Sequence, residues 1–322
     1  MESTPGGGES TGSTKLASNG YPYTALERFP LLKIIKSPAT ASLRSVLLRG
    51  VSSAFLMPLL CLLLLPGMRT WMPQDVPGQT TEETSVPSRL RTVVIDAGHG
   101  GKDPGCIGRI AREKNIALKI ALAVGRKIKA DMPQVRVIYT RNTDTFIELS
   151  ERSAIANRNK ADLFISIHCN ASPSSGRVYG TETYTMGLHK TEGNLEVAKR
   201  ENAVILKEEN YQETYRGFDP NSPLAHIMLA NYQHAFMSSS IDFAQKVEYC
   251  FKKYADRSSR GVRQAGFLVL WRTTMPSVLI ETGYLTNPAE ERYLASAQGQ
   301  DEISDSIVQA FRAYKHEIES VD

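Results

Sequence analysis

A chain of 322 residues is long enough for one large domain or two small ones. Its hydrophobic and charged fractions, 41% and 22%, are ordinary for a soluble globular protein. The net charge of +4 is mild, and part of it lies near the N-terminus at Lys33, Lys36, Arg44 and Arg49. Since no dense Lys/Arg stripe follows, we expect no nucleic-acid partner.

The first 88 residues divide by composition into three regions. Residues 1–50 begin with a Gly/Ser/Thr-rich stretch, which predicts disorder, and become basic toward their end. Residues 51–68 are apolar and follow basic residues, as in a secretory signal, so we expect export to the periplasm or cell envelope. Residues 69–88 have the Pro/Thr/Glu-rich composition of a linker.

The apolar run lies unusually far from Met1, and two interpretations stay open. Either the true start of the chain lies downstream, or the run is an uncleaved anchor that brings the N-terminal segment into contact with a membrane. The run is short for a spanning helix, and Pro58 and Pro66 interrupt it.

None of the four cysteines belongs to a C-x-x-C pair, so the sequence offers neither a zinc knuckle nor a thioredoxin-like motif. One disulfide, for instance between Cys106 and Cys169, is compatible with the sequence. We favour the simpler interpretation that the cysteines are small buried apolar side chains.

From residue 89 to about 318 the patterning is dense and predicts one catalytic-sized domain. Short β-branched runs alternate with helical patterns, which indicates an α/β sheet with crossover helices. The expected strands are residues 92–96, 135–140, 163–168, 181–185, 267–270 and 277–281. The expected helices are residues 114–130, 148–160, 194–211, 223–254 (broken) and 302–316.

Metal-binding or proton-transferring side chains follow three of these strands. His99 lies in the glycine-rich loop after the first strand, while His168 and Glu281 end two others. Glu113 follows the same loop, at the start of a helix. The carboxyl ends of parallel strands form the ligand crevice of open α/β sheets, so these side chains are expected to converge there.

Two histidines and a carboxylate form a common catalytic zinc shell, and a further carboxylate can act as general base. Each residue also has a structural interpretation when it is taken alone. His99 sits in a turn, Glu113 favours its helix N-terminus, and Glu281 can be a structural hydrogen-bonding group. Their convergence at equivalent strand ends favours a site.

The sequence resembles a known family at these positions. The motifs are VIDAGHGG at 94–101, REKN at 112–115, TRNTD at 140–144, ADLFISIHCNA at 161–171 and PSVLIETGYLTN at 276–287. A pattern of Leu149, Arg152, Ala156 and Asn157 joins them. In this order they resemble the catalytic domain of zinc-dependent N-acetylmuramoyl-L-alanine amidases of the Amidase_3 type, over residues 91–314.

The resemblance implies a fold, a cofactor and a reaction. The fold is a twisted, mostly parallel mixed sheet with helices on both faces. His99, Glu113 and His168 are expected to hold one Zn²⁺ per chain. Glu281 is expected to take a proton from water and return it to the leaving amine. The implied substrate is the amide between N-acetylmuramic acid and L-alanine in peptidoglycan, cut during wall remodelling or daughter-cell separation.

Residues around this centre carry weaker expectations. Asn170 and Arg141 are expected either to orient substrate or to support the site structurally. Asp96 is expected to be a partner of a ligand or a hydrogen-bonding group at a strand end.

The resemblance also implies a helical insertion, here around residues 188–260, which in related amidases covers the zinc until an activator protein displaces it. Its carboxylates Glu208, Glu209 and Glu213 are candidates for a plug on the metal, although a solvated charged face is favoured for any one of them.

Two other functions compete with the amidase. One is a zinc peptidase that acts on another wall-derived peptide. The other is a non-catalytic wall-binding relative, which predicts the loss of a ligand or of the catalytic glutamate. His99, Glu113, His168 and Glu281 are all present, which argues against the latter.

Overall fold

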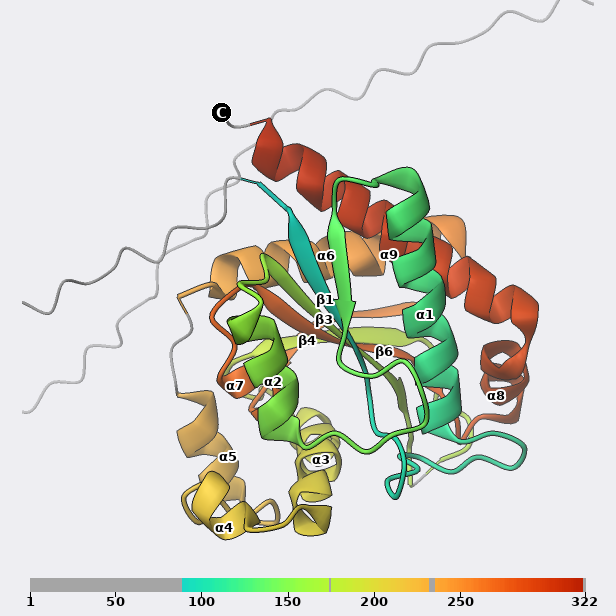
Figure 1. Ribbon diagram of the computed structural model, residues 1–322. Helices are drawn as coiled ribbons and strands as arrows, with labels where there is room; N and C mark the ends of the chain where they lie inside the picture. The colour runs from blue at the N-terminus through green and yellow to red at the C-terminus, as the bar shows by residue number, and fades with distance from the viewer. Residues whose placement is uncertain (1–88, 174, 232–234, 321–322) are drawn as a thin grey trace, which may run out of the picture. The chain divides into compact units, whose positions relative to one another are not determined.

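The computed structural model describes residues 89–173, 175–231 and 235–320, and Figure 1 shows them as a ribbon. Six strands form one sheet in the order β2-β1-β3-β6-β4-β5. Every neighbouring pair is parallel except β4 and β6, which are antiparallel. The mostly parallel α/β sheet predicted from the sequence is therefore confirmed. The strands are β1 (Thr92–Ala97), β2 (Arg136–Tyr139), β3 (Leu163–Asn170), β4 (Thr181–Met186), β5 (Ser259–Ala265) and β6 (Ser277–Tyr284).

Helices cover both faces of this sheet because the central strands are apolar on both sides. Alternate residues of β1 show the division: Val93 and Ile95 enter one core, and Val94 enters the other. The first face carries α1 (Glu113–Asp131), α6 (Met237–Tyr254), α8 (Pro288–Ala295) and α9 (Ala297–Glu319).

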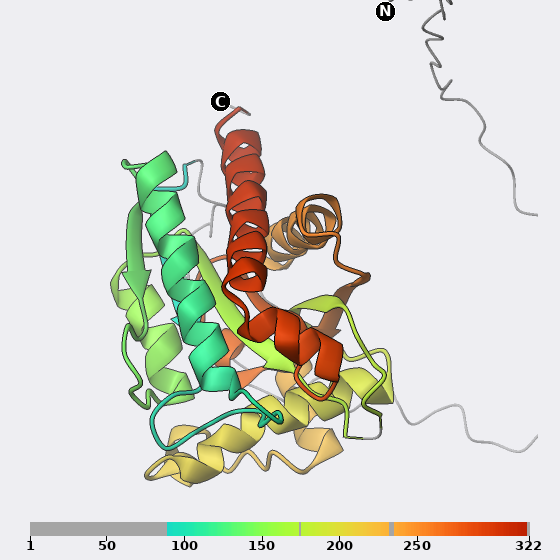
Figure 2. The ribbon, with the colours of Figure 1, turned by 90° about the vertical axis from the view of Figure 1, so that its right-hand side faces the viewer.

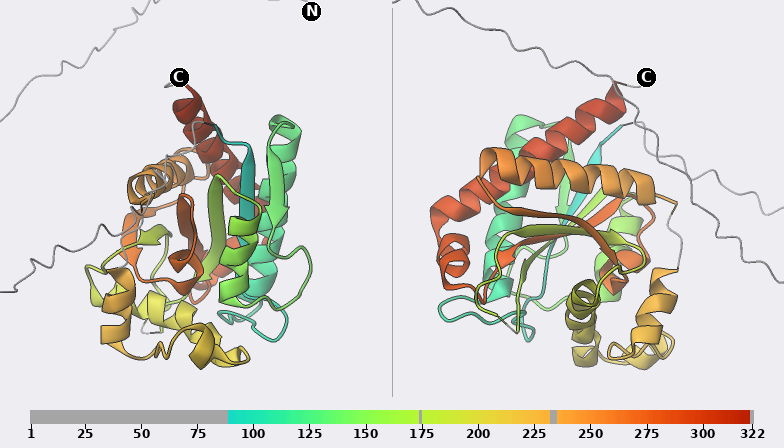
Figure 3. Two further views of the ribbon diagram at one scale, coloured as in Figure 1. Left: turned by 60° about the vertical axis from the view of Figure 1, so that its left-hand side comes forward. Right: turned by 180° about the vertical axis from the view of Figure 1, so that it is seen from behind.

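On this first face α1 and α9 lie side by side (Figure 2), and α6 crosses behind the sheet next to α9 (Figure 3). The second face carries α2 (Leu149–Arg158) and α7 (Leu268–Trp271). Residues of the chain between β4 and β5 complete that second core.

Between β4 and β5 the chain makes a helical excursion. It consists of α3 (Glu192–Asn202), the 3-10 helix η1 (Ala203–Lys207), α4 (Tyr211–Thr214) and α5 (Pro223–Ala230), followed by α6. Local signals set the starts of these helices. The side chain of Thr191 accepts a hydrogen bond from the Asn194 backbone N–H at the start of α3, and Ser222 does the same for Ala225 before Pro223 opens α5. In Figure 1, α3, α4 and α5 lie below the sheet, on the same side as the loop that follows β1.

Two predicted elements differ from the structure. The predicted strand at 267–270 is wrong, because these residues form the buried turn of helix α7. A short apolar run does not distinguish a buried strand from a buried helical turn. The sixth strand is β5, whose polar sequence and partial exposure fit its place at the sheet edge. The helix predicted at 194–211 is shorter in the structure, because α3 ends at Asn202. The helix predicted at 223–254 is broken as expected, into α5 and α6.

The predicted N-terminal regions 1–50, 51–68 and 69–88 lie outside the described residues. No helix in the described part of the chain has the length and apolar character needed to cross a membrane. Cys106, Cys169 and Cys250 are free thiols, so the suggested Cys106–Cys169 disulfide is not formed. Cys169 and Cys250 are buried, as the simpler interpretation predicted.

Candidate active site and metal centre

The strand register brings the predicted site residues to one edge of the sheet. His168 on β3 is the register partner of Glu281 on β6, and Ala97, the last residue of β1, pairs with Ile167. The loop after β1 then carries His99 back over this edge, and α1 begins at Glu113 beside it. The four predicted residues therefore meet where the parallel strands end.

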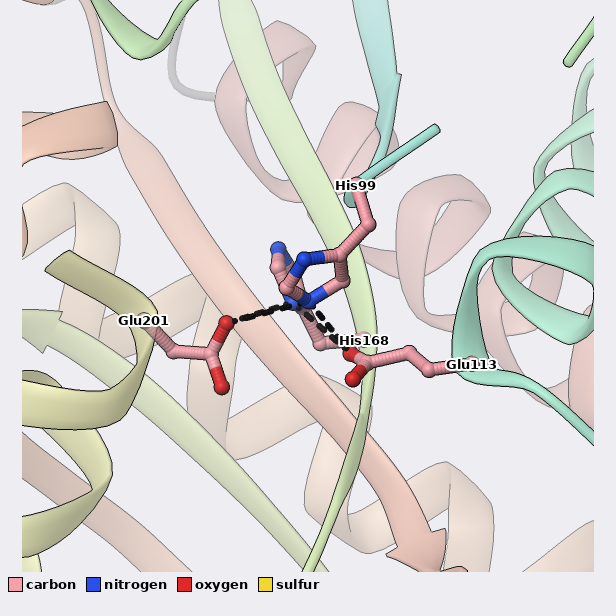
Figure 4. Close-up of side chains that lie close together, drawn as sticks. All are labelled: His99, Glu113, His168 and Glu201. Atoms are coloured by element: carbon pink, nitrogen blue, oxygen red, sulfur yellow. Dashed lines mark hydrogen bonds and ion pairs between the residues drawn. The ribbon is translucent and has the colours of Figure 1, made fainter. Parts of the chain in front are cut away.

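A fourth potential ligand, Glu201 of α3, joins His99, Glu113 and His168. One ligand atom from each residue lies within 4.8 Å of the others, and all four side chains are buried. Figure 4 shows the side chains pointing toward one another from the β1 loop, α1, β3 and α3. His99 Nε2 lies 3.0 Å from Glu113 Oε1 and 3.2 Å from Glu201 Oε2. His168 Nδ1 lies 3.0 Å and 3.1 Å from the same two oxygens.

This donor set fits a zinc ion. His99 Nε2 and Glu201 Oε2 are both buried without a hydrogen-bond partner, an arrangement that is costly unless the atoms face a ligand. Imidazole and carboxylate donors are the zinc ligands found in catalytic sites, and ligand atoms around tetrahedral zinc lie roughly 3.3 Å apart. The chemistry and spacing of His99, Glu113, His168 and Glu201 agree with that requirement.

The backbone of the loop is shaped to bring these groups together. A Cβ atom at Gly98 would lie 2.4 Å from the His168 ring, so only glycine lets the loop pass this close. A Cβ atom at Gly105 would lie 2.6 Å from Glu113 Oε2 and from the His99 ring. His99 itself has a φ of 60°, an uncommon value for a non-glycine residue.

Two buried arginines hold this loop from behind. Arg141 donates hydrogen bonds to the backbone oxygens of Ala97 and Gly98, and also of Thr143 and Lys114. Two roles were expected for Arg141, orientation of substrate or structural support. These contacts are those of a structural support. Arg152 donates to the backbone oxygen of His99 at 2.8 Å.

Asp96 anchors Arg152 beneath the site. The fully buried Asp96 carboxylate accepts hydrogen bonds from Arg152 at 2.7 Å, Thr140 at 2.6 Å and Ser166 at 2.7 Å. Burial alone would raise the pKa of this carboxyl, but Arg152 and the two hydroxyl groups lower it overall. Asp96 is thus a strand-end hydrogen-bonding group that supports the ligand loop.

The two carboxyls expected to bind metal and to move protons differ in ionisation. Burial disfavours the charged form of Glu113, yet the neighbouring His99 lowers the pKa of that carboxyl to about 2. Glu113 Oε1 also accepts from the Cys169 backbone N–H at 2.9 Å. Burial raises the pKa of Glu281 well above its ordinary value, and the nearby Glu201 carboxylate raises it further. A raised pKa suits a group that must take up and release a proton.

The segment that contains α3 closes the site. Arg200 lies 3.5 Å from Glu281 Oε1 and 3.1 Å from Glu201 Oε1. The cavity beside His99, His168 and Glu201 measures about 10 Å³, which is room for about one water molecule. A larger groove of about 810 Å³ lies along α3, and Asn170 and Arg200 are among its lining residues. The reacting centre is therefore covered, and Arg200 separates Glu281 from the larger groove.

Asn170 lies at this border. Its side-chain oxygen accepts from Arg200 at 3.0 Å, and its amide lies 3.3 Å from the buried carboxylate of Glu182. The residue is fully buried in this closed arrangement. Contact between Asn170 and substrate remains a prediction.

The structure places none of Glu208, Glu209 and Glu213 at the metal centre. Glu208 instead accepts hydrogen bonds from the Leu149 backbone N–H at 2.7 Å and from the Tyr215 hydroxyl at 2.6 Å. Glu209 and Glu213 are exposed, as expected for a solvated charged face. The insertion carboxylate at the metal centre is Glu201, which the sequence analysis missed. The available signal was its position on the apolar face of α3, among the buried residues Leu195, Val197 and Ala198.

Parts of this chain are similar to known proteins in sequence and in fold. Residues 93–313 match the family described as N-acetylmuramoyl-L-alanine amidase (Amidase_3). The N-acetylmuramoyl-L-alanine amidase AmiA of Escherichia coli K12 is 32% identical over 230 residues, which cover 70% of this chain and 76% of AmiA. AmiC of Escherichia coli O6:H1 is 32% identical over 246 residues, and the match spans only 57% of AmiC and 75% of this chain.

Solved structures give the same result. The catalytic domain of CwlV, an N-acetylmuramoyl-L-alanine amidase from Bacillus (Paenibacillus) polymyxa, is 32% identical with a TM-score of 0.52. The match covers 70% of this chain and 98% of the CwlV domain. AmiC2 of Nostoc punctiforme is 28% identical with a TM-score of 0.52, covering 71% of this chain and 98% of that structure.

Proposed function

This chain belongs to the Amidase_3 family of N-acetylmuramoyl-L-alanine amidases, and we propose that it hydrolyses the amide between N-acetylmuramic acid and L-alanine in peptidoglycan. The observation that carries the proposal is the convergence of His99, Glu113 and His168 beside Glu281 at the carboxyl edge of the sheet. We further propose that the protein acts outside the cytoplasmic membrane, where this substrate lies, during wall remodelling or daughter-cell separation.

In the proposed reaction His99, Glu113 and His168 hold one zinc ion. A zinc ion held by these residues would supply Lewis-acid chemistry, which polarises an amide carbonyl and lowers the pKa of a bound water. Glu281 takes a proton from that water and delivers it to the departing nitrogen of L-alanine. Its position opposite His168 in the strand register places the carboxylate next to the ligands. Arg141 and Arg152 keep the His99 loop in place during this chemistry.

We propose that the described conformation is an inhibited one, with Glu201 as the plug in place of the three candidate carboxylates named from the sequence. Glu201 Oε2 lies 3.1–3.2 Å from the two histidine nitrogens, where it would compete with water or a carbonyl oxygen for a bound metal. Its neighbour Arg200 simultaneously faces the catalytic carboxylate of Glu281. Substrate access then requires α3 to move, and an activator protein that binds the insertion is the expected cause.

Release of free N-terminal L-alanine from purified peptidoglycan tests the activity. The full-length chain with zinc is compared with a Glu281→Gln variant, which keeps the size of the side chain but cannot accept a proton. We expect the variant to lose at least about a hundredfold in rate, the usual contribution of a general base. Glu302→Gln, an exchange on α9, serves as a matched control with unchanged activity.

If cleavage products appear without free L-alanine amino termini, the scissile bond is different and a zinc peptidase takes the place of the amidase. If neither the full-length chain nor a Glu201→Gln variant releases any product, a wall-binding role replaces the enzymatic one.

A further inference from the structure

Asp103 lies behind the metal centre and contacts His99 on the side away from the other ligands. Its Oδ2 atom is 2.6 Å from His99 Nδ1, and the carboxylate is almost completely buried. The opposite ring nitrogen, Nε2, faces Glu113 and Glu201. An imidazole that donates its Nδ1 hydrogen to a carboxylate presents a free lone pair at Nε2, which is the form that binds a metal.

The main chain fixes Asp103 in this position. Its backbone N–H donates to the Gly100 oxygen at 3.0 Å, and its own carbonyl accepts from the Gly100 N–H at 2.9 Å. Gly105 N–H lies 3.3 Å from Asp103 Oδ1. The carboxylate is therefore held four residues after His99 by a tight turn, independently of the insertion.

The insertion meets the same carboxylate from the other side. Lys207, the last residue of η1, places its Nζ atom 2.6 Å from Asp103 Oδ1. The lysine side chain is 43% exposed, whereas the Asp103 side chain is 2% exposed. Asp103 thus interacts both with His99, a predicted metal ligand, and with Lys207, a cation of the insertion.

We propose that Asp103 is a positioning residue that holds His99 as the Nδ1–H tautomer and strengthens its Nε2 atom as a zinc ligand, and that Lys207 weakens this effect while the insertion is closed. The inference rests on the metal site proposed above. It gives the insertion a second contact with the metal centre, which acts through Asp103 and not through Glu201. Movement of η1 with α3 would return the full carboxylate charge to His99.

Metal affinity tests the role of Asp103. Zinc binding to the full-length chain is measured by competition with a chromophoric chelator, and the absorption bands of the Co²⁺-substituted protein report the ligand field. We expect Asp103→Asn to weaken zinc binding about 10- to 100-fold, the usual effect of losing such a carboxylate partner, and to shift the Co²⁺ bands at saturation. Asp144→Asn is the matched control, because Asp144 accepts from Gly101 N–H and Lys114 but contacts neither histidine.

The outcomes separate this inference from the metal site itself. Wild-type protein that binds neither Zn²⁺ nor Co²⁺ would overturn the site. If the wild type binds zinc and the Asp103→Asn variant binds it with an affinity within about twofold of the wild type, only the role of Asp103 is overturned.

A second comparison addresses Lys207 and does not depend on whether Asp103→Asn folds. Lys207→Gln is introduced into a Glu201→Gln background, so that loss of the plug does not contribute to the difference. We expect zinc to bind up to about fivefold more tightly than to Glu201→Gln alone, the range for one partly exposed charge. Equal or weaker binding would overturn the shared role of Asp103.

Discussion

Two buried glutamates near the metal centre, Glu201 and Glu281, differ in the groups that surround them. Glu201 lies within 3.2 Å of both histidine nitrogens, and its pKa is well below its ordinary value because these histidines and Arg200 outweigh the effect of burial. Within the described part of the chain, Glu281 has one oppositely charged partner at contact distance, Arg200, and burial dominates its pKa. These surroundings support the proposed division, in which Glu201 faces the metal and Glu281 transfers the proton.

Replacing Glu201 tests its role as a plug. We expect Glu201→Gln to raise amidase activity at least about tenfold at saturating zinc, because a neutral amide competes poorly with water and substrate for the metal. Release of L-alanine from peptidoglycan is the measurement. Glu196→Gln is the matched control, since Glu196 is exposed on the same helix and pairs only with Lys199. A fall in activity at full zinc occupancy would make Glu201 a required ligand instead.

The Asp96–Arg152 pair is expected to control stability more than chemistry. Arg152→Met should lower the free energy of unfolding by about 3–5 kcal/mol, because it leaves the Asp96 charge buried without its cation. Urea denaturation of the zinc-free protein measures this change. Arg158→Met breaks an exposed ion pair with Glu151 and should cost no more than about 1 kcal/mol. Equal effects of the two variants would contradict the importance assigned to the buried pair.

At the scale of elements, α3 joins two functions in one helix. Val197 and Ala198 pack into the second core, while Glu201 on the same buried side reaches the metal centre. The helix is therefore held by apolar packing and by the charges of the site together. Its stability determines how often the site opens, because opening breaks both kinds of contact.

The N-cap of α3 offers a test that leaves every site residue intact. Thr191→Ala removes the acceptor for the Asn194 N–H and should cost about 1 kcal/mol in helix stability. If α3 covers the site, this loss of stability increases the population of molecules with an open site. Basal amidase activity should then rise by up to about fivefold, which is the factor that corresponds to about 1 kcal/mol.

A matched cap elsewhere separates this effect from general loss of stability. Ser296 caps α9 by accepting from Gly299 N–H at 2.9 Å, remote from the metal centre. Ser296→Ala should lower stability similarly while activity stays constant. A parallel rise in both variants would show that global loosening, and not movement of α3, is the cause.

At the scale of the whole catalytic unit, the metal centre connects elements from distant parts of the chain. Its potential ligands come from the β1 loop, α1, β3 and α3. An ion bound at this junction stabilises the folded state and has no comparable site in the unfolded chain.

Removal of zinc is therefore expected to lower the melting temperature. At a free zinc concentration one hundred times Kd, the ion should contribute about 2.7 kcal/mol, or roughly 5–11 °C for a domain of this size. Thermal unfolding with zinc and with a chelator measures the difference. A His99→Gln variant should show a much smaller response, and an equal shift in that variant would place the stabilising ion elsewhere.

The sequence by itself determined five of the six strands and the edge of the sheet at which the candidate site lies. Apolar runs buried on both faces specify parallel strands almost independently of context, and the side chains that follow them must lie at one edge. For this reason the sequence predicts that His99, Glu113, His168 and Glu281 lie close together, and the family resemblance implies their roles. The short run at 267–270 failed because burial makes a strand and a helical turn look alike in sequence.

Only the tertiary structure decided which carboxylate of the insertion reaches the metal and which groups support it. The packing of α3 rotates Glu201 inward and leaves Glu209 and Glu213 in solvent, while Glu208 binds Tyr215. Arg141 supports the His99 loop through a contact that spans more than 40 residues of sequence. Lys207 contacts Asp103 across more than 100 residues. Local periodicity carries no information about such pairings, because they depend on how separate elements dock.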